Sequence, residues 1–220
     1  MKIILIALLA FVIFCLAVLS VATVYMYRVA CRRRKKDDRS VWDRVVFPLG
    51  ESDLQKFEPM LSDGRAWLLE RGKAEDVRRV SITSFDGLKL NARIIPQEGR
   101  STPRGIILML HGYRSNPLHD FGGSAKDFAS RGFMLCFPCQ RAHGDSEGIH
   151  LTYGVKERHD ALSWCRFLER EYPGLPIIMC GISMGASTVL MASSLDLPKS
   201  VCGIIADCGY TTPEEICKRC

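Results

Sequence analysis

The sequence predicts an α/β fold in which a doubly wound, mostly parallel sheet follows one N-terminal transmembrane helix. Two observations lead to this prediction: an uncharged apolar run opens the chain, and from residue 79 onward short apolar runs alternate with longer helix-period stretches. Such alternation is typical of parallel sheets that carry helices on both faces. With 220 residues, of which 47% are hydrophobic and 25% charged, the chain is long enough for one sizeable folded domain.

The run from Ile3 to Tyr27 contains no charged residue. As a helix that rises about 1.5 Å per residue, it would exceed the roughly 30 Å hydrocarbon layer of a bilayer. The alternative is a cleaved signal peptide, whose apolar region is normally about 7–15 residues long and ends at a small-residue cleavage site. The length of the run favours an uncleaved span, and we assign residues 1–27 to a transmembrane helix.

The formal net charge of +6 arises at the flanks of this span. Seven of the 30 basic residues lie between Lys2 and Lys36, whereas all 24 acidic residues lie at Asp37 or later. The chain beyond Lys36 is therefore close to neutral, which excludes a basic surface for nucleic acid. More positive charge follows the span than precedes it, so the positive-inside rule predicts a single-pass protein with its soluble domain in the cytoplasm.

The basic cluster Arg32–Lys36 has two interpretations, a topology signal or a contact with anionic lipid headgroups. Membrane lipid is thus the expected partner of residues 3–27 and, on the second interpretation, of the cluster. Residues 28–78 form this basic flank and an amphipathic linker. Within the linker, Val41 to Asp76 is predicted to be helical and to pack on the domain through Leu61, Trp67, Leu68 and Leu69.

Residues 79–220 form the predicted α/β domain. Its first two strands, Val80–Ser84 and Leu88–Ile94, alternate apolar and polar residues around Asp86-Gly87, a dipeptide that tight hairpin turns favour. Continuous apolar runs, typical of strands buried on both faces, follow at Gly105–Leu110, Phe133–Phe137, Ile177–Cys180 and Val201–Ala206. The clearest helix between these strands is Gly154–Glu171.

The motif Gly181-Ile182-Ser183-Met184-Gly185 joins an apolar strand to an Ala-rich helix. Small residues flank the serine where a sharp strand-to-helix turn holds its hydroxyl at the carboxyl edge of the sheet. The N-terminus of the following helix adds N–H groups and a favourable dipole for a developing oxyanion. The flanking strand and helix favour Ser183 as a catalytic nucleophile over the alternative, a Gly-rich turn at a helix start.

Further motifs, in the same order along the chain, resemble the α/β-hydrolase superfamily over about residues 79–217. The resemblance is closer to its bacterial serine aminopeptidase-like and esterase-like members. The motifs are His111-Gly112-Tyr113, the loop Gln140–Gly148, Thr152-Tyr153-Gly154 with Glu157 and Asp160, and Asp207-Cys208. The resemblance implies an α/β-hydrolase fold that is incomplete after its sixth strand. It also implies an oxyanion hole formed by the backbone N–H groups of Tyr113 and Met184, with no metal and no organic cofactor.

The resemblance assigns other polar residues near these motifs to structural roles. His111 would shape the oxyanion loop and His143 would brace the sheet edge, whereas a general base must reach the serine hydroxyl. His159, on the polar side of a helix, is expected in solvent. Asp207 is either a substitute catalytic acid or a structural residue, and its place in the family pattern favours the structural role. We expect the Cys-x-x-Cys pairs at 136–139 and 217–220 to be buried or unused thiols rather than a zinc or redox site.

The family orders its triad as Ser, then Asp or Glu, then His, and no histidine follows Ser183 here. Thr212-Pro213-Glu214-Glu215 has the pattern of a capping box, which starts a new helix near the end of the sequence. We therefore expect the chain to be the N-terminal part of a longer hydrolase.

The leading hypothesis is a membrane-anchored serine hydrolase that cleaves an ester, thioester or amide bond of a small-molecule or peptide acyl substrate through Ser183. The alternative is a non-catalytic, membrane-tethered binding domain or an inactive fragment that lacks the triad Asp and His.

Overall fold

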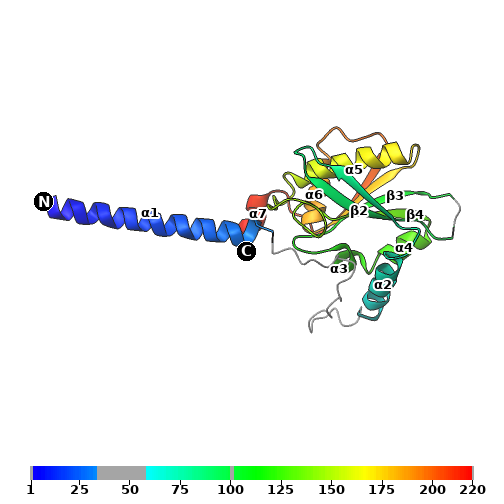
Figure 1. The fold of residues 1–220 in the computed structure, drawn as a ribbon, viewed down its shortest axis with the longest axis horizontal. Helices are drawn as coiled ribbons and strands as arrows, with labels where there is room; N and C mark the ends of the chain where they lie inside the picture. Colours follow the sequence, from blue (N-terminus) through cyan, green and yellow to red (C-terminus); the bar gives the residue numbers. More distant parts are fainter. Residues whose placement is uncertain (1, 34–57, 100–101, 220) are drawn as a thin grey trace.

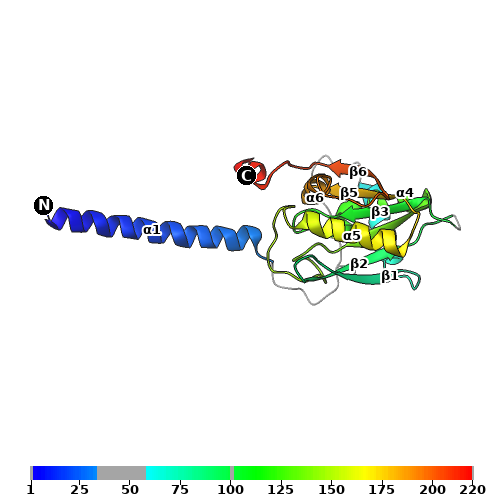
Figure 2. The same ribbon diagram turned by 90° about the horizontal axis from the view of Figure 1, so that it is seen from above.

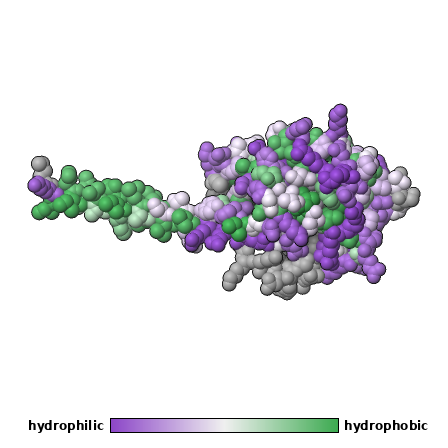
Figure 3. Space-filling view, turned by 45° about the horizontal axis from the view of Figure 1, so that its top comes forward, coloured by the Kyte–Doolittle hydropathy of each residue, from purple (hydrophilic) through white to green (hydrophobic). Residues whose placement is uncertain are grey.

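A long apolar helix extends from a layered α/β domain in the computed structural model, which describes residues 2–33, 58–99 and 102–219 (Figure 1). Helix α1, Lys2–Cys31, has no buried residue. Its length and composition would allow it to cross a membrane, and a signal sequence would pass the same test. Its surface is apolar along most of its length and becomes polar where it meets the domain (Figure 3).

Six strands form one mixed sheet within the described residues, in the order β1-β2-β4-β3-β5-β6. Strands β1 and β2 form the predicted antiparallel hairpin, and β2 also pairs antiparallel with β4. The other pairs, β4–β3, β3–β5 and β5–β6, are parallel. The bounds are Arg78–Thr83 (β1), Lys89–Ile95 (β2), Gly105–Leu110 (β3), Phe133–Pro138 (β4), Ile177–Ile182 (β5) and Val201–Asp207 (β6). The predicted mostly parallel α/β sheet is confirmed.

Helices cover both faces of this sheet (Figure 1). One face packs against α5 and α6 in a core that includes the buried Trp164. The other packs against α2, α3 and α4 in a core that includes the buried Phe121. Leu68 of α2 is fully buried in the second core, so the described part of the amphipathic segment packs on the domain as predicted. Residues 41–57 of that segment lie outside the described residues. The bounds are Glu58–Arg71 (α2), Pro117–Phe121 (α3), Ala125–Ser130 (α4), Glu157–Glu171 (α5), Met184–Ala192 (α6) and Pro213–Arg219 (α7).

Strand β6 is an exception to the prediction that all four continuous apolar runs are buried on both faces. β3 is buried along its whole length, whereas the residues of β6 are half-buried or exposed and Ile205 keeps 42% exposure. The reason is its position: β6 lies at the edge of the sheet and pairs only with β5 among the described strands. Residues Val201–Ala206 therefore form a strand, as predicted, but the prediction that this strand is buried on both faces was wrong.

The carboxyl ends of the parallel strands face the side from which α1 extends, as β3, β5 and β6 show in Figure 2. This edge carries the loops after β3, β4, β5 and β6. The motifs identified in the sequence therefore gather on the side of the domain that faces α1.

Candidate active site

Ser183 occupies the sharp turn between β5 and α6. Its backbone has φ +55° and ψ −116°, a conformation that costs a residue with a side chain conformational energy. The Ser183 N–H donates to the carbonyl of Asp207 at 2.8 Å, which ties the turn to the end of β6. The serine is exposed while Met184 behind it is fully buried. The turn thus presents the hydroxyl at the carboxyl edge of the sheet.

The glycines around Ser183 are required by close backbone approach, as the motif predicted. A Cβ on Gly185 would overlap the carbonyl of Leu110, and one on Gly181 would overlap the carbonyl of Gly185. A Cβ on Gly112 would lie 3.3 Å from the Ser183 Cβ. The loop after β3 therefore passes directly beside the serine.

Two backbone donors next to Ser183 are open. Among the described residues, neither the Tyr113 N–H nor the Met184 N–H donates a hydrogen bond, whereas the N–H groups of Gly112, Arg114 and Ser183 do. Gly112 donates to the Asp120 carboxylate at 2.6 Å, and Arg114 donates to His143 Nε2 at 3.0 Å. Open N–H groups at a helix N-terminus and a constrained loop are suited to stabilise an oxyanion. Their role in catalysis remains a prediction.

His111 is 1% exposed and is fully engaged with the backbone. The Gln140 N–H donates to its Nε2 at 3.2 Å, so Nδ1 carries the proton and donates to the Gly112 carbonyl at 2.9 Å. Burial lowers the pKa of His111, which keeps the ring neutral. A ring with both nitrogens occupied cannot take a proton from Ser183, and this geometry agrees with a role in shaping the loop.

His143 has the same arrangement in the loop after β4. Its Nε2 accepts from Arg114, and its Nδ1 donates to the Arg141 carbonyl at 2.9 Å. Its ring packs edge-on against His111, with 4.7 Å between the ring centres. Burial lowers the pKa of His143 to about 3. His159, expected in solvent, is instead half-buried against the Phe85 ring.

The free energy of unfolding is expected to fall as the pH drops below about 6.5, because the unfolded chain binds a proton at His143 while the folded protein does not. A base with a depressed folded pKa loses stability between its unfolded pKa and its folded pKa, here from about 6.5 to about 3. His143 alone contributes at most about 1.4 kcal/mol per pH unit to this slope. Urea titrations in detergent at pH 7, 6 and 5 measure it. His143→Gln should flatten the dependence, and an unchanged slope in this variant would contradict the assignment.

Arg141 braces the same edge from inside the domain. Its guanidinium donates to both carboxylate oxygens of Asp160 on α5, at 2.6 and 2.7 Å, and to both oxygens of Asp86 in the β1–β2 turn. The same guanidinium holds the pKa of Asp86 below its usual range. The Glu157 carboxylate similarly accepts from the Thr152 and Gly154 N–H groups at 2.9 Å. These contacts explain why charged residues accompany the loop motifs.

Cys136 and Cys139, the first Cys-x-x-Cys pair, are both buried, as expected. Burial raises the pKa of Cys139 to about 11 and raises that of Cys136 further, so both thiols stay protonated near neutral pH. Within the described residues, no group of three or more His, Cys, Asp or Glu side chains is placed to hold a metal ion. For the second pair, Cys220 and the side chain of Cys217 lie outside the described part.

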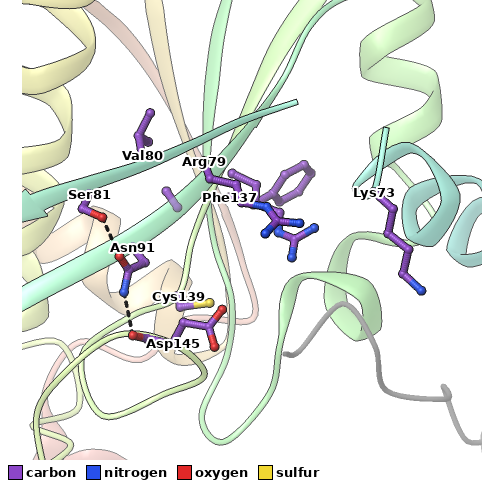
Figure 4. A pocket seen from close by; sticks show the side chains of 10 residues that line it. Lys73, Arg79, Val80, Ser81, Asn91, Phe137, Cys139 and Asp145 are labelled. Atoms are coloured by element: carbon purple, nitrogen blue, oxygen red, sulfur yellow. Dashed lines mark hydrogen bonds between the residues drawn. The ribbon is translucent and has the colours of Figure 1, made fainter. Parts of the chain in front are cut away.

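A cavity of about 310 Å³ lies away from Ser183, over β1, β2 and the start of the loop after β4 (Figure 4). Asn91, which lines the cavity, accepts a hydrogen bond from the Ser81 hydroxyl and donates one to the Asp145 carbonyl. Arg79 of β1 is the cross-strand partner of Arg93 of β2. Its lining is mostly polar and charged, so it does not suit an acyl chain. The lining residues are Lys73, Arg79, Val80, Ser81, Asn91, Ala92, Arg93, Phe137, Cys139 and Asp145.

Comparison with known proteins extends this description. The family model described as serine aminopeptidase, S33, matches residues 101–215. The solved structure of the esterase Pf2001 from Pyrococcus furiosus aligns with 28% identity and a TM-score of 0.55, covering 61% of this chain and 52% of the esterase. Another crystal form of the same esterase aligns with 24% identity and a TM-score of 0.57, covering 85% and 61%. The chain thus spans between 52% and 61% of that esterase's length. No curated protein sequence matches it.

Proposed function

We propose that this chain, which belongs to the serine aminopeptidase S33 family, is part of a membrane-anchored serine hydrolase. The family and the esterase similarity support a hydrolase of the α/β fold. The proposal adds that Ser183 is the nucleophile, that α1 is an uncleaved anchor, and that the domain faces the cytoplasm. The apolar composition of α1, none of whose residues is buried, supports the anchor. The excess of basic residues after the span supports the orientation.

The observation that carries the proposal is the exposed Ser183 between two open backbone donors. The serine Oγ would attack the carbonyl carbon of an ester, thioester or amide, and the Tyr113 and Met184 N–H groups would hold the oxyanion. Expulsion of the alcohol, thiol or amine would leave an acyl-serine, which water then hydrolyses. Among the described residues, no histidine hydrogen-bonds Ser183, and both ring nitrogens of His111 and of His143 are engaged with backbone groups, so neither of these two would serve as the general base.

A fluorophosphonate probe tests the nucleophile. The full-length protein in membranes should be labelled, and Ser183→Ala should abolish the label because the reactive hydroxyl is gone. Ser194→Ala, which changes an exposed serine just after α6, serves as the control and should be labelled like the wild type. Equal labelling of Ser183→Ala, or no labelling of either protein, would rule out the proposal.

The second candidate is a non-catalytic binding domain tethered to the membrane. The engagement of both His111 and His143 with backbone groups favours it, since neither is available to activate the serine. An unassisted serine hydroxyl is a poor nucleophile. Absence of labelling in the full-length wild type, with a folded domain, would support this candidate.

A further inference from the structure

We infer that the active-site edge of the domain lies at the membrane surface and that the substrate is a long-chain acyl ester held in the bilayer. This inference rests on the proposed function, because it requires α1 to span the membrane and Ser183 to attack an acyl group. It is carried by the contacts that fix the end of α1 against the loops around Ser183.

The last turn of α1 is capped by side chains of the domain. The Ala30 carbonyl accepts hydrogen bonds from the Tyr113 hydroxyl at 2.7 Å and from the Tyr153 hydroxyl at 3.0 Å. The Arg114 guanidinium donates to the carbonyls of Val29 and Arg32. The last carbonyls of a helix have no donor within the helix, so external donors such as these stabilise its end. Tyr113 and Arg114 belong to the loop that supplies the proposed oxyanion donor.

The residues after the helix fix its direction through a second loop. The Leu151 N–H donates to the Cys31 carbonyl at 2.7 Å, and the Arg33 N–H donates to the Ile149 carbonyl at 2.8 Å. The Arg33 guanidinium also donates to the carbonyls of Ser146 and Gly144. Two separate loops at the carboxyl edge therefore hold α1, and the helix leaves the domain on the side to which β3 and β5 point (Figure 2).

Contacts near Tyr27 place this edge relative to the bilayer. Tyr27 is the last residue of the uncharged run, and tyrosine is enriched at the membrane–water interface. Its hydroxyl forms a 2.8 Å hydrogen bond with His150 Nδ1, so His150 lies at the depth of the interface. Ala30 follows about 4.5 Å farther along the helix axis, at 1.5 Å per residue. Ile149, beside His150, exposes 58% of its surface, as an apolar side chain at the interface would.

A short series of contacts leads from this interface to the nucleophile. Tyr113 bonds Ala30 of α1, and the adjacent Gly112 lies against Ser183. A bilayer-held acyl ester keeps its chain in the hydrocarbon and its carbonyl near the interface, on the side where Ser183 is exposed. Each buried CH₂ of the chain adds about 0.8 kcal/mol to membrane partitioning, which concentrates long-chain esters at this surface and leaves short ones in water.

Tryptophan quenching tests the depth of this edge without requiring activity. The full chain is placed in phosphatidylcholine vesicles that contain a brominated phosphatidylcholine. Ile149→Trp should add fluorescence that the brominated lipid quenches strongly. Lys199→Trp, at an exposed position just before β6 on the opposite edge, should add fluorescence that the lipid leaves unquenched. Equal quenching at both positions, or none at Ile149→Trp, would overturn the inference.

A pair of fluorophosphonates tests the substrate class on the full-length protein in the same vesicles. A long-alkyl probe in the bilayer should label Ser183 at least tenfold faster than a short water-soluble probe. A flexible Gly/Ser insertion between Tyr27 and Arg28 leaves the last turn of α1 bonded to Tyr113 and Arg114. It should bring this ratio close to one and change the short-probe rate less than twofold. The same insertion after Gly174, an exposed turn on the far edge, should preserve the ratio.

A ratio near one in the wild type, or a ratio that the Tyr27–Arg28 insertion leaves unchanged, would overturn the inference while the proposed function stands. Labelling by neither probe would overturn the proposed function and the substrate class with it. The quenching result would still report the orientation of the domain.

Discussion

Replacing Gly185 with alanine is expected to destabilise the domain by about 3 kcal/mol or more, at the upper end of the range for overpacked cores. The added Cβ would overlap the carbonyl of Leu110, and the next nearest atoms also belong to the backbone of β3 and its following residue. Neither the strand nor the buried helix α6 can move without disturbing the core. Urea unfolding, followed by tryptophan fluorescence in detergent, measures the loss.

Gly203→Ala is the matched control, because its Cβ would meet only Ile178 Cγ1, at an ordinary 3.9 Å. We expect a change within about 0.5 kcal/mol, as is usual for substitutions that disturb no packed contact. A similar loss in both variants would show that the close approach of β3 and α6 is not the cause.

Arg141→Met is expected to cost about 3–5 kcal/mol, the usual effect of removing one partner of a buried ion pair. The Arg141 side chain is 3% exposed and that of Asp160 is 7% exposed, so the variant leaves a buried carboxylate without its cation. The β1–β2 turn also loses its connection through Asp86. The same urea titration measures the effect.

Two comparisons separate the ion pair from a general loss of charge. Arg131→Met removes an exposed pair with Asp127 and should leave the unfolding midpoint unchanged. Arg141→Met combined with Asp160→Leu should recover part of the stability, because the buried Asp160 carboxylate that Arg141 neutralised is removed with it. If the double variant is less stable than Arg141→Met alone, the explanation by an unpaired charge is wrong.

Local patterns were sufficient to predict most of the fold. Asp86-Gly87 between two alternating runs predicted the hairpin, and four continuous apolar runs predicted the parallel strands, because periodicity and turn chemistry act within a few residues. The serine turn was predictable for the same reason. Its glycines are required where backbone segments come close together around a single strand–turn–helix unit. The short helix α3 was missed, although Asn116 before Pro117 is a recognisable start signal.

Contacts between distant segments left no comparable signal. The exposure of β6 depends on its place at the sheet edge, which its own apolar residues do not encode. Arg141 meets Asp86 and Asp160 across separations of 55 and 19 residues. The hydrogen bond between the Tyr113 hydroxyl and Ala30 joins residues 83 positions apart. Motifs mark several of these residues in the sequence, but nothing near them indicates which distant residue each one contacts.

The docking of α1 also decides where the gene can be shortened to express a water-soluble form. A start at Asp37, just after the basic cluster, would look natural from the charge pattern. It would deprive Tyr113, Tyr153 and Arg114 of the carbonyls of Val29 and Ala30, next to Ser183. A start at Arg28 removes the apolar span and keeps the last turn of the helix. For biochemical work, that last turn belongs with the α/β domain rather than with the apolar run.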